Sequence, residues 1–167
     1  ADGVSPDFVT LSSVLKACHT IGAIHKGREM HAEIVRKGYE GNLFAHSTLV
    51  DLYARCGSLQ ESQDVFDRLV VRDAVSWNAL MAGYSQHGLG EEILQCFKEM
   101  KEEGVTPDAV TYVFILKACG MSKKVHIGKQ IHDEIVSKGM LEKEVMIGNA
   151  LVDMYAKCGM LVKARQV

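Results

Sequence analysis

Residues 31–38 read HAEIVRKG, and residues 132–139 read HDEIVSKG, 101 positions further along the chain. Residues 15–18 and residues 116–119, also 101 positions apart, both read LKAC. Self-similarity at a fixed spacing is the signature of a repeat protein. The sequence therefore predicts an array of like units rather than a single globular core.

Each unit begins with apolar residues at i, i+3, i+4 and i+7, which is the spacing of one stripe of an α-helix. The stripes are Leu11, Val14, Leu15, Cys18; His46, Leu49, Val50, Tyr53; Trp77, Leu80, Met81, Tyr84; and Tyr112, Ile115, Leu116, Cys119. A turn with glycine follows, and then a second amphipathic stretch, such as Met30, Ile34, Val35 or Ile93, Leu94, Phe97, Met100. The pattern predicts an all-α, right-handed α-solenoid of about ten helices, stacked as helical hairpins.

Glycines and a Pro-Asp pair at the expected helix ends divide the chain into repeats. Gly38, Gly104 and Gly139 stand where helix C-caps would, and Pro107-Asp108 ends one unit and starts the next. The predicted repeats are 8–42, 43–73, 74–108 and 109–144, with 145–167 an incomplete repeat and 1–7 the tail of another. The second repeat is shorter than the others by about one helical turn. Terminal units of solenoids carry a polar outer face, and neither end has one, so we expect self-association through these ends.

Composition limits the partners. The 167 residues are 47% hydrophobic and carry a formal net charge of -2. No apolar run is long enough to cross a membrane, so no membrane partner is expected. A negative chain binds nucleic acid weakly overall, because phosphate neutralisation supplies most non-specific affinity. A local basic groove is still compatible with this charge, although most lysines are expected to form a solvated face.

Enzyme-like motifs are incomplete. Both His31-x-Glu33 and His132-x-Glu134 match half of a zinc deaminase site, but the Pro-Cys-x-x-Cys half is absent. The two copies also occupy one repeat position, so the repeat itself accounts for them. Five cysteines form no Cys-x-x-Cys pair and are expected to be small buried hydrophobes. We expect no catalytic residues, no metal and no cofactor.

Three positions, counted from the first residue of each repeat, hold side chains of the same polarity in all or most repeats. The second position is always apolar: Val9, Phe44, Val75, Val110 and Met146. The fifth is polar in four of five repeats: Ser12, Ser47, Asn78, Val113 and Asn149. The last is polar throughout: Asn42, Asp73, Asp108 and Glu144. Asn and Ser are mediocre helix formers, so their recurrence inside a helix indicates a row of polar side chains. An aspartate at the last position would also suit the N-cap of the next helix, and this alternative stays open.

Several stretches resemble the pentatricopeptide repeat family, and in particular its PLS class, which alternates standard, long and short motifs in plant organelle RNA-editing factors. The stretches are VSWNALMAGY at 75–84, GVTPD at 104–108 and LVDMYAKCG at 151–159. The repeat at 74–108 resembles a standard motif. The repeats at 8–42 and 109–144 resemble long ones, and those at 43–73 and 145–167 resemble short ones.

The resemblance implies a reader of single-stranded RNA that takes one base per repeat. The base would be held between second-position residues and read along its edge by the fifth and last positions. Ser47 with Asp73 would prefer guanine, Asn78 with Asp108 uracil, and Ser12 with Asn42 adenine. Val113 with Glu144 departs from the pattern and should be indifferent, and Asn149 suggests a pyrimidine. The expected RNA is 5′-A-G-U-any-pyrimidine-3′, and no DNA partner is expected.

The resemblance also implies a mitochondrial or chloroplast location, a role in C-to-U editing, and docking of small editing-cofactor proteins at the long repeats. A protein scaffold similar to tetratricopeptide repeats is the competing function. A constant period of 34 residues would favour that scaffold, whereas the lengths of 35, 31 and 36 and the polar fifth positions do not. An enzyme is a distant third.

Overall fold

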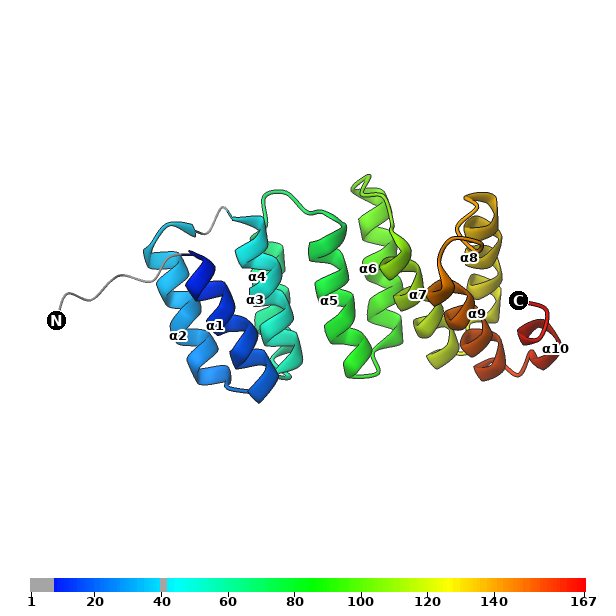
Figure 1. Cartoon of the computed structure of the whole chain (residues 1–167), viewed down its shortest axis with the longest axis horizontal. Coiled ribbons are helices and arrows are strands. Elements are labelled where there is room, and N and C mark those ends of the chain that lie inside the picture. Colours follow the sequence, from blue (N-terminus) through cyan, green and yellow to red (C-terminus); the bar gives the residue numbers. More distant parts are fainter. Residues whose placement is uncertain (1–7, 40–41) are drawn as a thin grey trace. The chain divides into compact units, whose positions relative to one another are not determined.

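The computed structural model describes residues 8–39 and 42–167, without the side chains of Phe8, Ser12, Lys16 and His19 (Figure 1). These residues form helices and turns, with no strand among them. The helices are α1 (Phe8–Ile21), α2 (Ile24–Arg36), α3 (Leu43–Arg55), α4 (Leu59–Asp67), α5 (Ala74–Gln86), α6 (Gly90–Glu102), α7 (Ala109–Met121), α8 (Val125–Ser137), α9 (Val145–Lys157) and α10 (Leu161–Ala164). The odd-numbered helices begin at the first residues of the predicted repeats. No helix in the described part of the chain is long and apolar enough to cross a bilayer.

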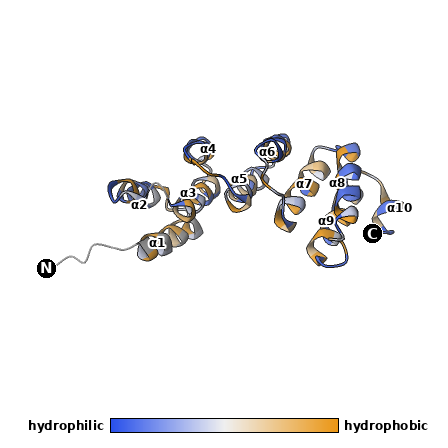
Figure 2. Ribbon diagram, turned by 90° about the horizontal axis from the view of Figure 1, so that it is seen from above, coloured by the Kyte–Doolittle hydropathy of each residue, from blue (hydrophilic) through white to orange (hydrophobic). Residues whose placement is uncertain are grey.

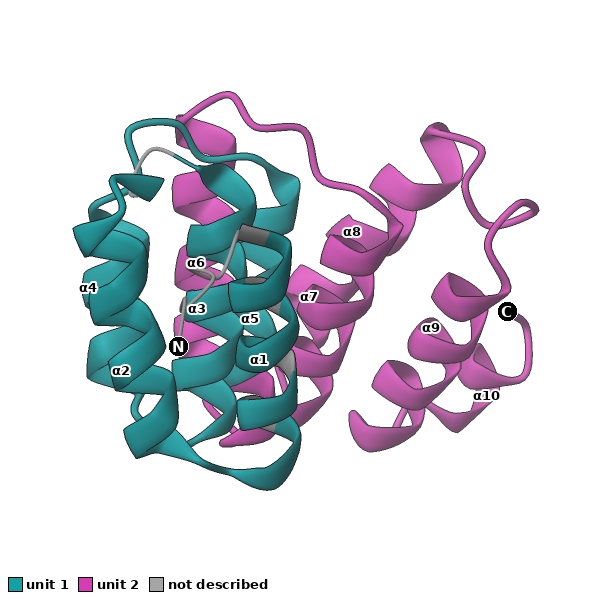
Figure 3. Cartoon of the chain, turned by 60° about the vertical axis from the view of Figure 1, so that its left-hand side comes forward, with its two compact units in different colours: residues 1–83 teal, residues 84–167 magenta. Residues whose placement is uncertain are grey.

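Two compact units divide the chain at Gly83, within α5 (Figure 3). The first unit holds α1 to α4 and most of α5, and the second holds the end of α5 and α6 to α10. Within each unit, short turns join successive helices into hairpins. The prediction of an all-α stack of hairpins is confirmed, with ten helices in the described residues.

The predicted apolar stripes form the core of each unit. In the first unit, Leu15, Leu49 and Leu80 are buried, and the ring of Trp77 packs edge-on against Phe66 with centroids 4.6 Å apart. In the second unit, Tyr112 is buried beside Phe97, with ring centroids 6.4 Å apart. Second helices such as α2, α4 and α6 are coloured largely hydrophilic in Figure 2, whereas the first helices contain more hydrophobic residues. A helix with one apolar stripe needs contact on one side only, which suits the second helices to the edge of the stack.

Glycines end several helices, and one glycine allows two helices to pack closely. Gly38, Gly104 and Gly139 have φ of 71°, 74° and 61° and follow the last residues of α2, α6 and α8, as predicted for C-caps. At Gly83 an added Cβ would lie far inside contact distance of the Ala54 side chain. The absence of a side chain therefore lets α5 lie against α3 in the first unit.

One residue of the predicted apolar stripes is exposed rather than buried or half-buried. Val35 was expected in the buried stripe of α2, but its side chain is 40% exposed. Its repeat counterpart in α8, Val136, is 54% exposed, so this position of the second helix faces solvent in both long repeats. Val35 lies at the rim of a pocket that Val65, Arg68 and Val70 also line.

Candidate nucleic-acid interface

The five second-position residues share one environment. Val9, Phe44 and Val75 in the first unit, and Val110 and Met146 in the second, are each between 40% and 70% exposed. The apolar stripe that follows in the same helices is buried, with Leu49, Leu80 and Ile115 at most 1% exposed. Each first helix therefore presents an apolar side chain to solvent at its second position, where burial does not explain the residue type.

The fifth-position residues lie one helical turn further along. Ser47 is almost buried, and its hydroxyl donates to the carbonyl of Leu43 at 2.9 Å. Asn78 and Val113 are partly exposed, and Asn149 is exposed. Ser12 lies in α1, but its side chain is outside the described residues. Because the Ser47 proton is already engaged, its oxygen can serve an incoming group only as an acceptor.

The last-position residues cap helices. Asn42 Oδ1 accepts from the amide of Ala45 at 3.1 Å, Asp73 Oδ1 from Ser76 at 2.9 Å, and Asp108 Oδ1 from Thr111 at 2.8 Å. The N-cap interpretation therefore holds for three of the four residues, whereas Glu144 makes no side-chain cap bond. Capping uses one oxygen, and a carboxylate has two, so this role is compatible with a contact to a ligand.

A pocket of about 310 Å³ lies between α7 and α9 in the second unit. Its lining includes the fifth-position residues Val113 and Asn149 and the second-position residue Met146. The structure thus brings together predicted contact residues from two consecutive repeats. The other lining residues are Lys117, Ala150 and Asp153, which sequence reasoning did not assign to the site. Lys117 and Asp153 each lie four residues after a fifth position, and this i+4 spacing is the signal that could have found them.

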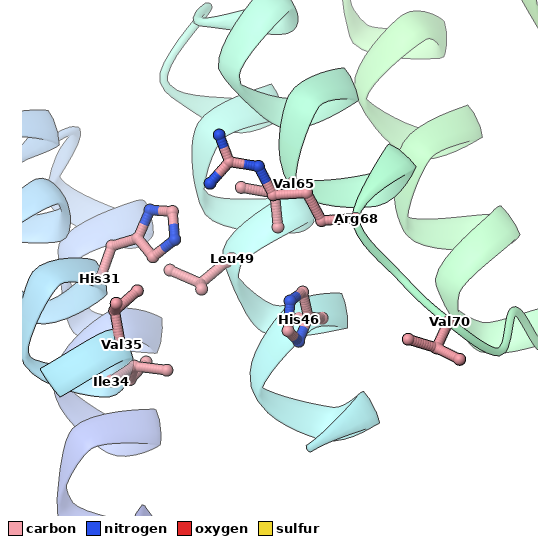
Figure 4. A pocket seen from close by; sticks show the side chains of 8 residues that line it. All are labelled: His31, Ile34, Val35, His46, Leu49, Val65, Arg68 and Val70. Carbon is pink, nitrogen blue, oxygen red and sulfur yellow. The ribbon is translucent and has the colours of Figure 1, made fainter. Parts of the chain in front are cut away.

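A second pocket, of about 340 Å³, lies in the first unit (Figure 4). It is lined by His31, Ile34, Val35, His46, Leu49, Val65, Arg68 and Val70. None of these residues occupies a second, fifth or last position. The pocket is bounded by α2, α3, the end of the short α4 and the segment after it.

The two His-x-Glu motifs build structural contacts. His31 Nδ1 lies 2.9 Å from the Tyr53 hydroxyl, and His132 Nδ1 lies 2.9 Å from the Tyr155 hydroxyl. Each histidine ring also meets its tyrosine edge-on, with centroids 5.6 Å apart. No group of three potential metal ligands occurs among the described residues. Burial raises the pKa of Cys119 to about 12, which fits a small buried hydrophobe rather than a reactive thiol.

The glutamate of the second motif belongs to a local charge network. Tyr112 donates to Glu134 at 2.6 Å, and Lys138 donates to both Glu134 and the Tyr112 hydroxyl, at 2.8 Å and 2.6 Å. Burial raises the pKa of Glu134, but the bonds from Lys138 and Tyr112 outweigh it and bring the pKa to about 2. Glu134 is therefore a bonded carboxylate at neutral pH and not a proton shuttle.

Most of the helices described above match models of a known protein family. The model of the PPR repeat family matches residues 72–121, and the model of the PPR repeat matches residues 44–73 and 149–167. The chain belongs to the pentatricopeptide repeat family. A chloroplastic pentatricopeptide repeat-containing protein of Arabidopsis thaliana is 42% identical over 159 residues, covering 95% of this chain and 26% of that protein. A mitochondrial one from the same plant is 36% identical over 165 residues, covering 99% of this chain and 23% of that protein.

Solved pentatricopeptide repeat structures share the fold. The structure of PPR10, a maize protein, in complex with an 18-nt psaJ RNA element superposes with a TM-score of 0.80 at 25% identity. The match covers 98% of this chain and 25% of PPR10. The fold is therefore of the all-α solenoid class predicted from the repeats. The chain spans about a quarter of the length of the relatives it matches.

Proposed function

We propose that the chain binds single-stranded RNA and reads one base per repeat, as the recognition segment of an organellar RNA-processing or editing factor. The observation that carries the proposal is the exposure of an apolar side chain at the second position of all five first helices. Bases offer flat apolar faces, and a regular row of exposed apolar side chains suits stacking with successive bases. The solved structure of PPR10 with RNA supports the same class of ligand.

The last-position residues limit which bases can bind, because most of them are carboxylates. A carboxylate only accepts hydrogen bonds. Guanine and uracil carry a ring N–H in the middle of the Watson–Crick edge, whereas adenine and cytosine carry a ring acceptor there. Asp73 therefore favours guanine or uracil in its repeat, and Asp108 does the same in the next. Asn42 can donate as well as accept, which is compatible with the adenine proposed for the first repeat.

The fifth-position residue then separates large from small bases. Ser47 is short and nearly buried, with its hydroxyl directed to Leu43, so it leaves room for a purine and offers an acceptor. Guanine fits both requirements. Asn78 is a longer side chain, which suits the smaller uracil, and Asn149 suits a pyrimidine for the same reason. Val113 has no polar atom, so we propose that its repeat accepts any base.

The remaining parts of the proposal rest on the relatives and on repeat length. Relatives are named chloroplastic and mitochondrial, and we propose one of these organelles for this protein. The repeat boundaries at 8, 43, 74, 109 and 145, the alternation of long, short and standard motifs, and the role in C-to-U editing are part of the same proposal. Docking of small editing-cofactor proteins on the long repeats at 8–42 and 109–144 is proposed as a second role.

Titration with short RNAs tests the proposal. We expect the chain to bind 5′-A-G-U-A-U-3′ within a longer single strand at low salt, and to lose most of this affinity at physiological salt because few repeats contribute. The same sequence in a duplex should bind at least about tenfold more weakly, because paired bases cannot enter between side chains. Equal affinity for duplex and single strand would contradict the proposal, and no binding to any RNA would favour the protein-scaffold alternative.

A further inference from the structure

The pocket between α7 and α9 contains two charged residues besides the proposed base contacts. Asp153 Oδ2 accepts a hydrogen bond from Lys157 Nζ at 2.7 Å, so its charge is locally balanced. Lys117 makes no side-chain hydrogen bond or ion pair within residues 8–39 and 42–167, as far as their side chains are described. The pocket is therefore left with one uncompensated positive charge.

Both long repeats have a lysine at the same position, Lys117 in α7 and Lys16 in α1, whose side chain lies outside the described residues. Lys117 follows the fifth-position residue Val113 by four residues and lies one turn further along the same face of α7. In the first unit, the matching residue of α3 is Asp51, and Arg55 Nε donates to its Oδ1 at 2.7 Å. The short repeats thus hold a neutralised carboxylate at this position, Asp51 or Asp153, whereas the long repeats hold a lysine, and that of the repeat at 109–144 is unpaired within the described residues.

We propose that Lys117 binds a backbone phosphate of single-stranded RNA, beside the base placed between Val110 and Met146. The inference rests on the proposed function. The phosphodiester is the one anion that every RNA carries, and a lysine ammonium on a flexible stem is a suitable point charge for it. Lys117 lines the pocket together with Met146 and Asn149, which places its stem next to the proposed base contacts.

A phosphate contact from Lys117 complements the fifth-position residue of this repeat. Val113 cannot form a hydrogen bond with a base edge, so the repeat at 109–144 contributes little sequence-dependent affinity. A phosphate contact adds affinity without regard to base identity. A repeat that accepts any base can therefore still keep the RNA in register for its neighbours.

Replacing Lys117 with Gln removes the charge while keeping a polar stem of similar length. Lys129→Gln is the matched control, because it removes the same charge from α8 of the same repeat, which does not line this pocket. Binding to one single-stranded RNA is measured from low to moderate salt for the unmodified chain and both variants. For Lys117→Gln we expect affinity at low salt to fall about two- to five-fold, as for an exposed ion pair.

The salt dependence identifies the contact. Loss of one phosphate contact should make the slope of log affinity against log salt less steep by about 0.7 for a single strand. The deficit of Lys117→Gln should then shrink as salt rises from about 50 to about 200 mM, by up to about 2.6-fold for the larger deficits, and vanish for the smaller ones. Lys129→Gln should keep the slope of the unmodified chain, and Lys117→Arg should restore it.

Two outcomes would overturn the inference while leaving the proposed function intact. One is an unchanged slope for Lys117→Gln in a chain that binds RNA. The other is an altered base preference at the position of this repeat, which would make Lys117 a base contact. If the unmodified chain binds no single-stranded RNA at any salt, the proposed function fails first, and the phosphate contact fails with it.

Discussion

Replacing Phe44 and Val75 together by alanine should weaken binding to single-stranded RNA by about 2–4 kcal/mol. A base stacked on an aromatic ring contributes about 1–3 kcal/mol, and the lost methyl groups of valine add up to about 1.5 kcal/mol. Stability should change by less than about 0.5 kcal/mol, because both side chains are at least half exposed and alanine is a better helix former. Competition binding at low salt, together with thermal unfolding, separates the two effects.

The control for this pair lies in the same unit. Val70 and Val71 are 98% and 68% exposed in the segment between α4 and α5, and neither occupies a second position. Replacing both by alanine removes a similar exposed apolar area and should leave RNA affinity unchanged. If both double variants lose affinity equally, exposed apolar surface as such binds the RNA, and the stacking role of the second position is wrong.

Trp77→Ala should lower the free energy of unfolding by about 3–5 kcal/mol, as loss of a large buried aromatic side chain does. Trp77 is 1% exposed and packs on Phe66, and the guanidinium of Arg72 lies 5.9 Å from its ring centroid. In a chain of this size the melting temperature should fall by roughly 6–20 °C. Circular dichroism at the helical signal measures this shift.

Trp77→Phe provides the comparison. It keeps an apolar ring in the core and removes an indole N–H that has no hydrogen-bond partner among the described residues. The loss should be clearly smaller than for alanine, because the replacement retains most of the buried area. Equal losses for the two variants, or no loss for alanine, would show that Trp77 does not anchor α5. Because Trp77 lies between Val75 and Asn78, its packing also sets the direction in which those two residues face.

Much of the fold could be predicted from the sequence because the repeats carry their own periodicity. The i, i+3, i+4, i+7 stripes placed Leu49, Leu80 and Ile115 in the core, and glycines such as Gly104 marked the helix ends. The prediction was wrong for Val35 because it directly follows the buried Ile34, and the spacing within α2 does not show which of two adjacent apolar residues faces the neighbouring helix.

The candidate site was only partly predictable. The fixed positions identified Met146, Val113 and Asn149, which the structure brings to one pocket. Two features depend on contacts that periodicity does not report. The hydroxyl of Ser47 is held by the carbonyl of Leu43, and Lys117 is left unpaired while Asp153 is bonded to Lys157. Such pairing is decided by rotamers and neighbouring helices, so it appears only in three dimensions.

One competition experiment tests base reading most directly. Two single-stranded RNAs of identical composition, containing A-G-U-A-U or A-U-G-A-U, are competed against each other at low salt. The unmodified chain should prefer A-G-U-A-U, because each mismatched polar contact costs about 1–3 kcal/mol. A chain carrying both Ser47→Asn and Asn78→Ser should prefer A-U-G-A-U by a similar amount, with a melting temperature close to that of the unmodified chain. If both proteins prefer the same RNA, or neither distinguishes the two, the chain does not read bases through its fifth positions.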